Sequence, residues 1–253
     1  MSSIIDNYRA GKSNLRDAIR TLRTNIQFAG FNGKMQTIVI TSVMPHEGKS
    51  SIALYLGIAM AEMGKETVVI DADCRRPMIS NYLKQRPQKG LMDVMSNETD
   101  IDSAITATSQ PGLYFLDTKT LANPVEVLSS KRFREVMKSL EERFDTIIID
   151  TPPLFSFIEA AVLAQQADGT VLVIRPGQTE IKAAQEVVEQ LNKANAKIIG
   201  VVLNGVPRND SGYYYYNSYY YRNGRRKKKK RSTSIWTKLG FKKINFKKTG
   251  KRK

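Results

Sequence analysis

Six short runs of apolar, mostly β-branched residues recur along the chain, and they constrain its fold more than any other feature. They are TIVIT (37–41), TVVID (67–71), LYFLD (113–117), TIIID (146–150), TVLVI (170–174) and IIGVVL (198–203). Each run is nearly continuous in apolar residues instead of alternating with polar ones. This pattern is typical of strands that are buried on both faces of a parallel sheet.

The segments between these runs have the pattern of helices. Apolar residues recur at spacings of three and four, and helix formers are abundant. Helices are expected over residues 50–64, 129–144, 157–167 and 181–194, and a further one over 14–28 precedes the first strand. Alternating strands and helices predict a doubly wound α/β fold with a mainly parallel sheet, in which ligands bind at the carboxyl ends of the strands.

The positive charge of the chain lies at one end. Of the 40 Lys and Arg residues, 16 fall in residues 222–253, which contain no acid, and the other 24 balance the 24 Asp and Glu. We therefore expect one neutral domain over residues 1–208, which includes the N-terminal helix. Like charges at the density of the C-terminal segment resist compaction, so residues 209–253 are expected to be a disordered tail.

Several classes of protein are excluded by what the chain lacks. Its one cysteine, Cys74, cannot form an intramolecular disulfide, and no Cys/His cluster has metal-ligand spacing, which favours a reducing cytosol and argues against a zinc site. Charged residues interrupt the first 31 positions, so no signal-peptide core is expected. The apolar runs are far shorter than the ~20 residues of a membrane span.

A variant phosphate-binding loop follows the first strand. Gly48, Lys49 and Ser50 match the end of GxxxxGK[ST], whereas Val43 replaces the first glycine. Loop amides can bind phosphate oxygens, Lys49 can reach the β- and γ-phosphates, and the Ser50 hydroxyl can bind Mg²⁺. The predicted nucleotide-binding residues are Pro45, His46, Glu47, Gly48, Lys49, Ser50 and Ser51. The competing interpretation is a tight turn that contains Gly-Lys-Ser by chance.

Three aspartates at the ends of predicted strands weaken that competing interpretation. Asp71 and Asp73 follow one strand, and Asp150 ends another. A carboxylate at a buried strand end must be desolvated or paired, so it is poorly suited to stability alone. Beside a triphosphate it can position Mg²⁺ or its waters. The loop and the aspartates together predict a nucleotide-binding site with Mg²⁺.

These residues resemble the bacterial tyrosine kinases of capsule and exopolysaccharide synthesis, in the cytoplasmic form found in Gram-positive bacteria. The matching segments are RTLRTNIQF (20–28), TSVMPHEGKSS, VVIDADCRRP, ANPVEVL, FDTIIIDTPP and GVVLNGV, followed by a tyrosine cluster. The resemblance implies a P-loop nucleotide-binding fold and phosphoryl transfer from MgATP to a tyrosine hydroxyl.

The resemblance also implies roles for single residues. Lys49 would stabilise charge on the phosphates, and Ser50 with Asp150 would hold Mg²⁺. Either Asp71 or Asp73 would orient the attacking phenol or accept its proton, and the spacing does not decide between them.

An assembly and two protein partners are implied as well. The motif that assembles the family into a homo-oligomer corresponds here to Asp17, Arg20 and Arg23, with Asp in place of Glu. The expected partners are a membrane activator or adaptor protein of the polysaccharide co-polymerase type and a cognate tyrosine phosphatase.

The tail carries the candidate phosphoacceptors next to its basic segment. Seven of the 11 tyrosines lie within nine positions: Tyr213, Tyr214, Tyr215, Tyr216, Tyr219, Tyr220 and Tyr221. Each phosphate would add roughly −1.5 to −2 charges and oppose assembly of neighbouring subunits. Residues 222–253 are expected to bind the anionic inner face of the plasma membrane, which predicts a cytoplasmic, peripheral protein. Nucleic acid is an unlikely partner, and a merely solubilising tail is the plainest alternative.

Two other functions compete with an autokinase. The first is a membrane- or DNA-associated positioning ATPase of the partition or division-site type, which has the same fold. A sequence that resembles those ATPases would carry a further lysine early in the phosphate motif. The loop VMPHEGKS has no such lysine, which favours the kinase. A regulatory scaffold would bind nucleotide and transfer nothing.

Overall fold

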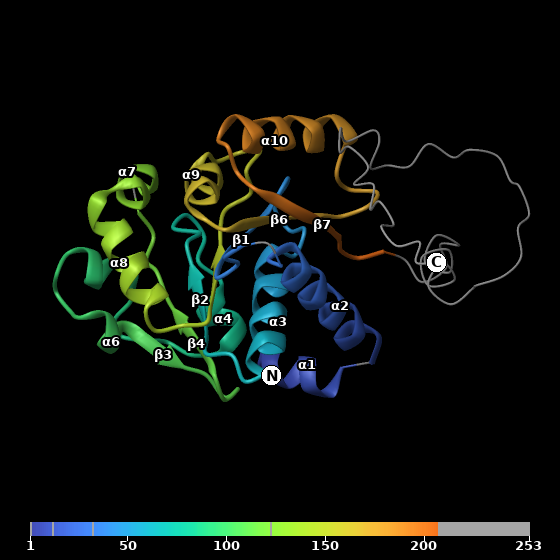
Figure 1. The fold of residues 1–253 in the computed structure, drawn as a ribbon. Coiled ribbons are helices and arrows are strands. Elements are labelled where there is room, and N and C mark those ends of the chain that lie inside the picture. The colour runs from blue at the N-terminus through green and yellow to red at the C-terminus, as the bar shows by residue number, and fades with distance from the viewer. Residues whose placement is uncertain (1, 12, 32, 122, 207–253) are drawn as a thin grey trace, which may run out of the picture.

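A seven-stranded sheet organises the computed structural model, which describes residues 2–11, 13–31, 33–121 and 123–206. The strand order is β3-β4-β2-β5-β1-β6-β7, and every pair is parallel except β3 with β4. The strands are β1 (Thr37–Ser42), β2 (Thr67–Asp71), β3 (Ile105–Ala107), β4 (Leu113–Leu116), β5 (Thr146–Asp150), β6 (Gly169–Ile174) and β7 (Ile198–Leu203). This confirms the predicted doubly wound α/β fold, shown in Figure 1.

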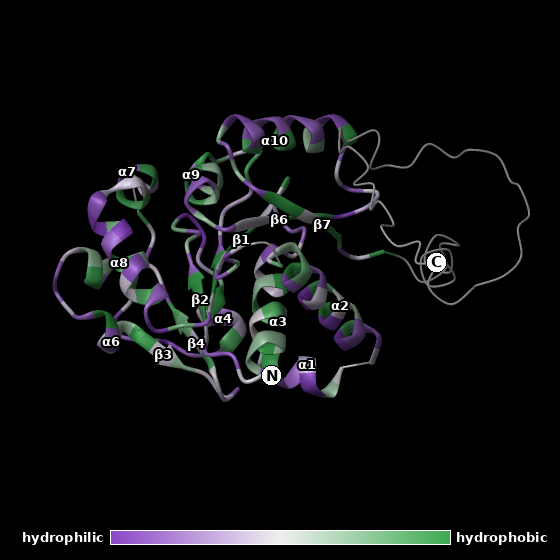
Figure 2. Ribbon diagram, viewed as in Figure 1, coloured by the Kyte–Doolittle hydropathy of each residue, from purple (hydrophilic) through white to green (hydrophobic). Residues whose placement is uncertain are grey.

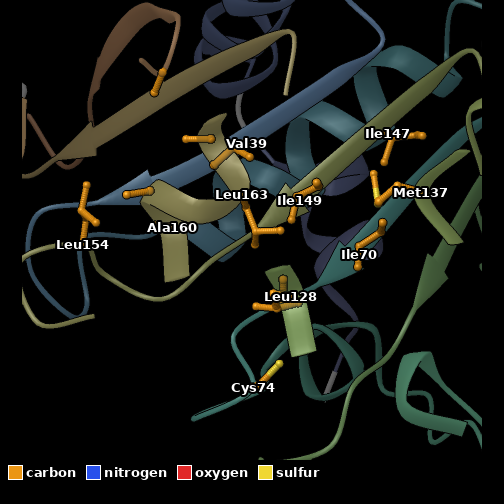
Figure 3. Packing of buried hydrophobic residues seen from close by; sticks show 14 of the residues in the cluster. Val39, Ile70, Cys74, Leu128, Met137, Ile147, Ile149, Leu154, Ala160 and Leu163 are labelled. Carbon is orange, nitrogen blue, oxygen red and sulfur yellow. The ribbon is translucent and has the colours of Figure 1, made fainter. Parts of the chain in front are cut away.

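The sheet is covered by helices on both faces, which form two apolar layers. One face packs against α1 (Ile4–Ala10), α2 (Ser13–Ala29), α3 (Lys49–Ala61) and α4 (Ile79–Leu83). The other packs against α5 (Leu91–Met95), α6 (Ile101–Ala104), α7 (Pro124–Ser129), α8 (Lys131–Glu141), α9 (Glu159–Gln166) and α10 (Ile181–Lys193). Figure 3 shows part of this second layer, with Ile149 of β5, Met137 of α8 and Leu163 of α9.

Burial explains why the central strands are continuous in apolar residues. Every residue of β1, β2, β5 and β6 is buried, whereas the edge strand β7 is mostly half-buried. The covering helices α8 and α10 are amphipathic, with polar residues on their outer sides (Figure 2).

Helix α3 differs from the other helices because it is apolar on nearly all sides. It lies between the sheet and helices α1 and α2, and all but three of its 13 residues are buried. At Gly57 it approaches the sheet closely: a Cβ atom there would lie 2.9 Å from Val69 Cγ2 and 3.0 Å from Leu113 Cδ1. The helix that begins at the phosphate loop is therefore held firmly in the core.

All six predicted strands and the N-terminal helix lie where the sequence indicated, the latter as α2. The short antiparallel strand β3 and the short helices α1, α4, α5, α6 and α7 were not predicted. The proposed tail at 209–253 lies outside the described residues. Within the described ranges, no helix combines the length and apolarity needed to cross a bilayer.

Replacing Gly57 by alanine tests the close packing of α3. Alanine favours a helix by about 1 kcal/mol over glycine, but overpacking a filled core costs about 1–3 kcal/mol. We expect a net loss of about 1 kcal/mol, which lowers Tm by roughly 2–4 °C in a thermal melt. Gly200→Ala in β7 is the control, because in the described chain no atom beyond the two neighbouring residues lies within 4 Å of its added Cβ. An unchanged or higher Tm for Gly57→Ala would contradict the packing argument.

Candidate active site

The phosphate loop connects β1 to α3 and presents the start of that helix to solvent. Gly48 precedes the helix with φ of +92°, and no side chain caps the helix there. A Cβ at Gly48 would collide with the side-chain amide of Asn204, so glycine is required on two grounds. The uncapped first N–H groups of a 13-residue helix form an anion-binding site.

Glu47 fixes the shape of this loop from the inside. Its carboxylate is fully buried and accepts hydrogen bonds from the Met44 backbone N–H, at 2.9 Å, and from the Thr179 hydroxyl. Its backbone carbonyl accepts one from Asn204 Nδ2 at 2.8 Å. The Glu47 side chain therefore faces the protein interior, and a nucleotide contact at this residue would have to come from its main chain.

Lys49 lies among the carboxylates that end the neighbouring strands. Its ammonium is 2.9 Å from Asp73 Oδ2, 3.6 Å from Asp150 Oδ1 and 3.2 Å from the Ser50 hydroxyl. Because β2 and β5 are adjacent and parallel, Asp71 and Asp150 are register partners at the same edge of the sheet. The fold thus brings together the lysine and the three aspartates that the sequence singled out.

Asp71 and Asp73 differ in orientation. The Asp71 carboxylate is fully buried and accepts hydrogen bonds from the backbone N–H groups of Asp73, Met78 and Ile79. Asp73 lines the open cavity, where one oxygen pairs with Lys49 and the other accepts the Arg76 backbone N–H at 3.1 Å. Asp71 organises the loop, and Asp73 is the carboxylate that a bound molecule can reach.

Burial dominates the electrostatics of this cluster. It raises the pKa of Asp71, and the Asp150 carboxylate adds to the effect. Burial also raises the pKa of Asp150, although Lys49 opposes that change. For Lys49, burial favours the neutral amine, but the carboxylates of Asp150 and Asp73 outweigh it and raise the pKa. Lys49 is therefore a permanent cation at neutral pH.

A cavity of about 520 Å³ opens above these residues. Six of the seven predicted nucleotide-binding residues line it: Pro45, His46, Gly48, Lys49, Ser50 and Ser51. Its other lining residues are Asp73, Arg75, Arg76, Met78, Tyr82, Pro153, Phe157, Arg175 and Asn204, and of these the sequence reasoning identified only Asp73. Arg75, Pro153 and Asn204 follow strand ends in VVIDADCRRP, IIIDTPP and GVVLN, so attention to every strand end would have found them.

The residues fit a hydrated Mg²⁺ bound with a nucleotide. Both carboxylate oxygens of Asp150 are buried without a hydrogen-bond partner in the described part of the chain. Within the same residues, no three carboxylate, imidazole or thiol groups converge to hold a metal by themselves. Mg²⁺ commonly keeps several waters and takes phosphate oxygens alongside one or two protein ligands. Ser50 and Asp150 match that pattern.

The residues predicted to mediate assembly lie on α2, away from the cavity. Asp17 and Arg20 are exposed and 3.9 Å apart. Arg23 instead turns inward and donates a hydrogen bond to the Ala59 carbonyl of α3 at 2.9 Å. The seven predicted phosphoacceptor tyrosines and the basic segment lie beyond residue 206, outside the described residues.

Comparisons with known proteins point to one family. Residues 35–201 match the family model described as an AAA domain. Tyrosine-protein kinase YwqD of Bacillus subtilis is 36% identical over 195 residues, which cover 77% of this chain and 82% of that protein. The kinase domain of the Escherichia coli tyrosine kinase ETK superposes with a TM-score of 0.73 at 27% identity, covering 78% of this chain and 77% of that one.

A cell-division ATPase has a similar fold but a weaker match. The septum site-determining protein MinD of Pyrococcus horikoshii, complexed with Mg-ADP, gives a TM-score of 0.60 at 26% identity and covers 70% of this chain and 73% of that one. The comparisons therefore favour the kinases over the positioning ATPases.

Asp150→Asn tests whether the carboxylate cluster destabilises the fold. Burial raises the pKa of Asp71 to about 8 and that of Asp150 to about 6, so both bind protons more tightly when folded. The stabilisation that comes from this tighter proton binding is complete below about pH 4. It is lost progressively as the pH rises from about 4 to 6 for Asp150 and from about 4 to 8 for Asp71. In urea melts without nucleotide, we expect the free energy of unfolding of Asp150→Asn to exceed that of wild type by about 1–3 kcal/mol at pH 8. At pH 5 the difference should be smaller.

The control for this measurement is Asp102→Asn on α6, where the carboxylate is exposed. Parallel pH profiles for Asp150→Asn and wild type would show that the cluster does not strain the fold.

Proposed function

Because this chain belongs to the bacterial tyrosine-protein kinases, we propose that it transfers the γ-phosphoryl group of ATP to tyrosines 213–221 of its own tail. The observation that carries the proposal is the position of Lys49 at the start of α3, among three strand-end carboxylates and beside an open cavity. A kinase of this kind would regulate capsule or exopolysaccharide polymerisation and export.

Lys49 and the loop amides would bind the phosphates. The triphosphate competes with Asp73 and Asp150 for the ammonium, whose three donors can be shared between them. The uncapped N–H groups of α3 supply further donors that are already oriented, so little reorganisation is needed during the reaction.

Ser50 and Asp150 would hold Mg²⁺, which neutralises charge on the β- and γ-phosphates when bound. Asp150 is suited to this because its two oxygens are desolvated and accept no hydrogen bond within the described chain, although Lys49 lies 3.6 Å from one of them. The Ser50 hydroxyl lies 3.2 Å from the Lys49 ammonium, and both residues line the cavity.

Asp73 is the carboxylate that would receive the phenol. The tyrosine oxygen attacks the γ-phosphorus, the bond to the β-phosphate oxygen breaks, ADP leaves, and the phenol proton passes to the carboxylate. A phenol with a pKa of ~10 needs such an acceptor at neutral pH. Asp71 is ill placed for this step because its oxygens already accept three backbone hydrogen bonds.

Assembly and membrane association complete the proposal. Exposed Asp17 and Arg20 on α2 are available to a second subunit, whereas Arg23 already serves the contact with α3. The basic segment 222–253 would bind the inner face of the plasma membrane, near an activator of the polysaccharide co-polymerase type. A tyrosine phosphatase would reverse the modification.

Substitution of the site residues tests phosphoryl transfer directly. Incubation with MgATP, with and without a membrane activator, followed by phosphopeptide mass spectrometry should place phosphate within residues 213–221. Lys49→Met should abolish labelling, and Asp73→Asn should reduce it by roughly 10²–10⁴-fold with little change in ATP affinity. Undiminished labelling of Lys49→Met would refute the assignment, and ATP hydrolysis without labelling would favour the positioning ATPase.

The tail's charge predicts a switch in membrane affinity. Each basic residue near an anionic surface contributes roughly 1 kcal/mol to binding, and each phosphotyrosine adds a charge of roughly −1.5 to −2, which opposes that binding. We expect the unphosphorylated chain to co-sediment with phosphatidylserine vesicles more strongly than the phosphorylated chain. Neutral phosphatidylcholine vesicles are the control. Equal co-sedimentation of both forms would remove the switch and leave the kinase assignment intact.

A further inference from the structure

A second connection joins the loops that carry Asp73 and Asp150, beside the cavity. Arg75 lies two residues after Asp73, and its Nε and Nη2 are each 2.8 Å from Oε1 of Glu159. Glu159 begins α9, at the end of the segment that follows Asp150. The Arg75 guanidinium also lies 4.3 Å from the centroid of the Phe157 ring, in that same segment. We call these contacts the Arg75–Glu159 tie.

Arg75 is the cation that pairs with the buried carboxylate of Glu159. The carboxylate is only 1% exposed, and its Oε2 has no hydrogen-bond partner in the part of the chain that the structure describes. A buried carboxylate is tolerated when a well-oriented cation pairs with it, and removal of that cation is strongly unfavourable. Arg75 is 40% exposed and lines the cavity, so the tie runs from the edge of the active site into the core.

Among the residues that the structure describes, the only other cation that pairs with carboxylates of these loops is Lys49, whose ammonium lies 2.9 Å from Asp73 and 3.6 Å from Asp150. The ion pairs of Lys49 with Asp73 and Asp150 weaken when phosphates bind the ammonium, because its N–H donors are then shared between the carboxylates and the phosphates. The Arg75–Glu159 tie shares no atom with Lys49. Together with the backbone hydrogen bond from the Ala72 N–H to the Asp150 carbonyl, at 2.8 Å, it can therefore hold the two loops together when Lys49 no longer does.

We propose that Arg75 is a positioning residue for phosphoryl transfer, which acts through Glu159 and Phe157 to hold the Asp150 loop against the Asp73 loop while Lys49 is engaged by ATP. The inference rests on the proposed kinase function. Catalytic groups displaced by about 1 Å can slow a reaction by about 10²-fold without a comparable loss of binding. The role is thus distinct from that of a phosphate ligand, whose loss would weaken nucleotide affinity.

The test compares Arg75→Gln, Glu159→Gln and the double variant as full-length proteins. We expect kcat for tail phosphorylation to fall roughly 10- to 100-fold in each single variant, while ADP affinity changes less than about threefold. The double variant should be no slower than the worse single variant, because the two residues act as one unit. Lys34→Gln is the matched control, since it removes the surface ion pair Lys34–Glu141 far from the cavity.

A second measurement does not depend on kinase activity. Hydrogen exchange of the amides of residues 151–158, with ADP bound, should be faster in Arg75→Gln than in wild type and unchanged in Lys34→Gln. If Glu159→Gln does not fold, Arg75→Lys replaces it: this variant keeps the charge but loses the planar fork of donors, and should still lower kcat and speed the exchange.

Three results would overturn the inference: an unchanged kcat in the Arg75 variants, kcat losses that add in the double variant, or a fall in ADP affinity as large as the fall in kcat. The last would make Arg75 a ligand of the nucleotide. Failure of wild type to label any tyrosine would instead refute the proposed function, and the exchange of residues 151–158 would still decide whether the tie holds the loops.

Discussion

The structure depends on a concentration of buried charge at the carboxyl ends of β1, β2 and β5. Asp71, Asp73 and Asp150 meet there around the single ammonium of Lys49. Because helices cover both faces of the sheet, these groups lose their hydration. They interact instead with one another and with backbone amides. These interactions do not fully replace the lost hydration, since Asp150 accepts no hydrogen bond from the described residues. Desolvated negative charge is unfavourable for folding, but a magnesium–phosphate complex requires it. Such a complex also requires a cation that can change partners, as Lys49 can.

The sequence predicted the sheet well because burial on two faces leaves a strong local signal. Runs such as TVVID and TIIID became β2 and β5 at the predicted positions. It missed β3, which is three residues long and partly exposed, and α4 and α5, which have five residues each. Elements this short bury too few side chains to show a period. Their neighbours define them: β3 pairs with β4, α4 packs against α1 and α3, and α5 packs against α6 and α8.

The same distinction applies to the site. Lys49 and the aspartates could be predicted because a local motif or a strand end marks each one. The orientation of Asp71 and Asp73 could not, since it follows from where the start of α4 places the amides of Met78 and Ile79. The inward position of Glu47 was equally hidden, because its partner Thr179 is 132 residues away. Spacing identifies which residues meet at the sheet edge, but long-range contacts decide which of them faces the ligand.

Helix α3 has a mechanical consequence for how this enzyme can respond to its nucleotide. The helix begins at the phosphate loop, is apolar on almost every side and leaves no room for a methyl group at Gly57. A helix packed in this way cannot slide or rotate without disrupting the core packing on two sides. The phosphate end of the site is therefore stationary, and a conformational signal must travel outward through the loops after β2 and β5, whose residues 75–76 and 155–156 are exposed. Such a signal leaves the core unchanged.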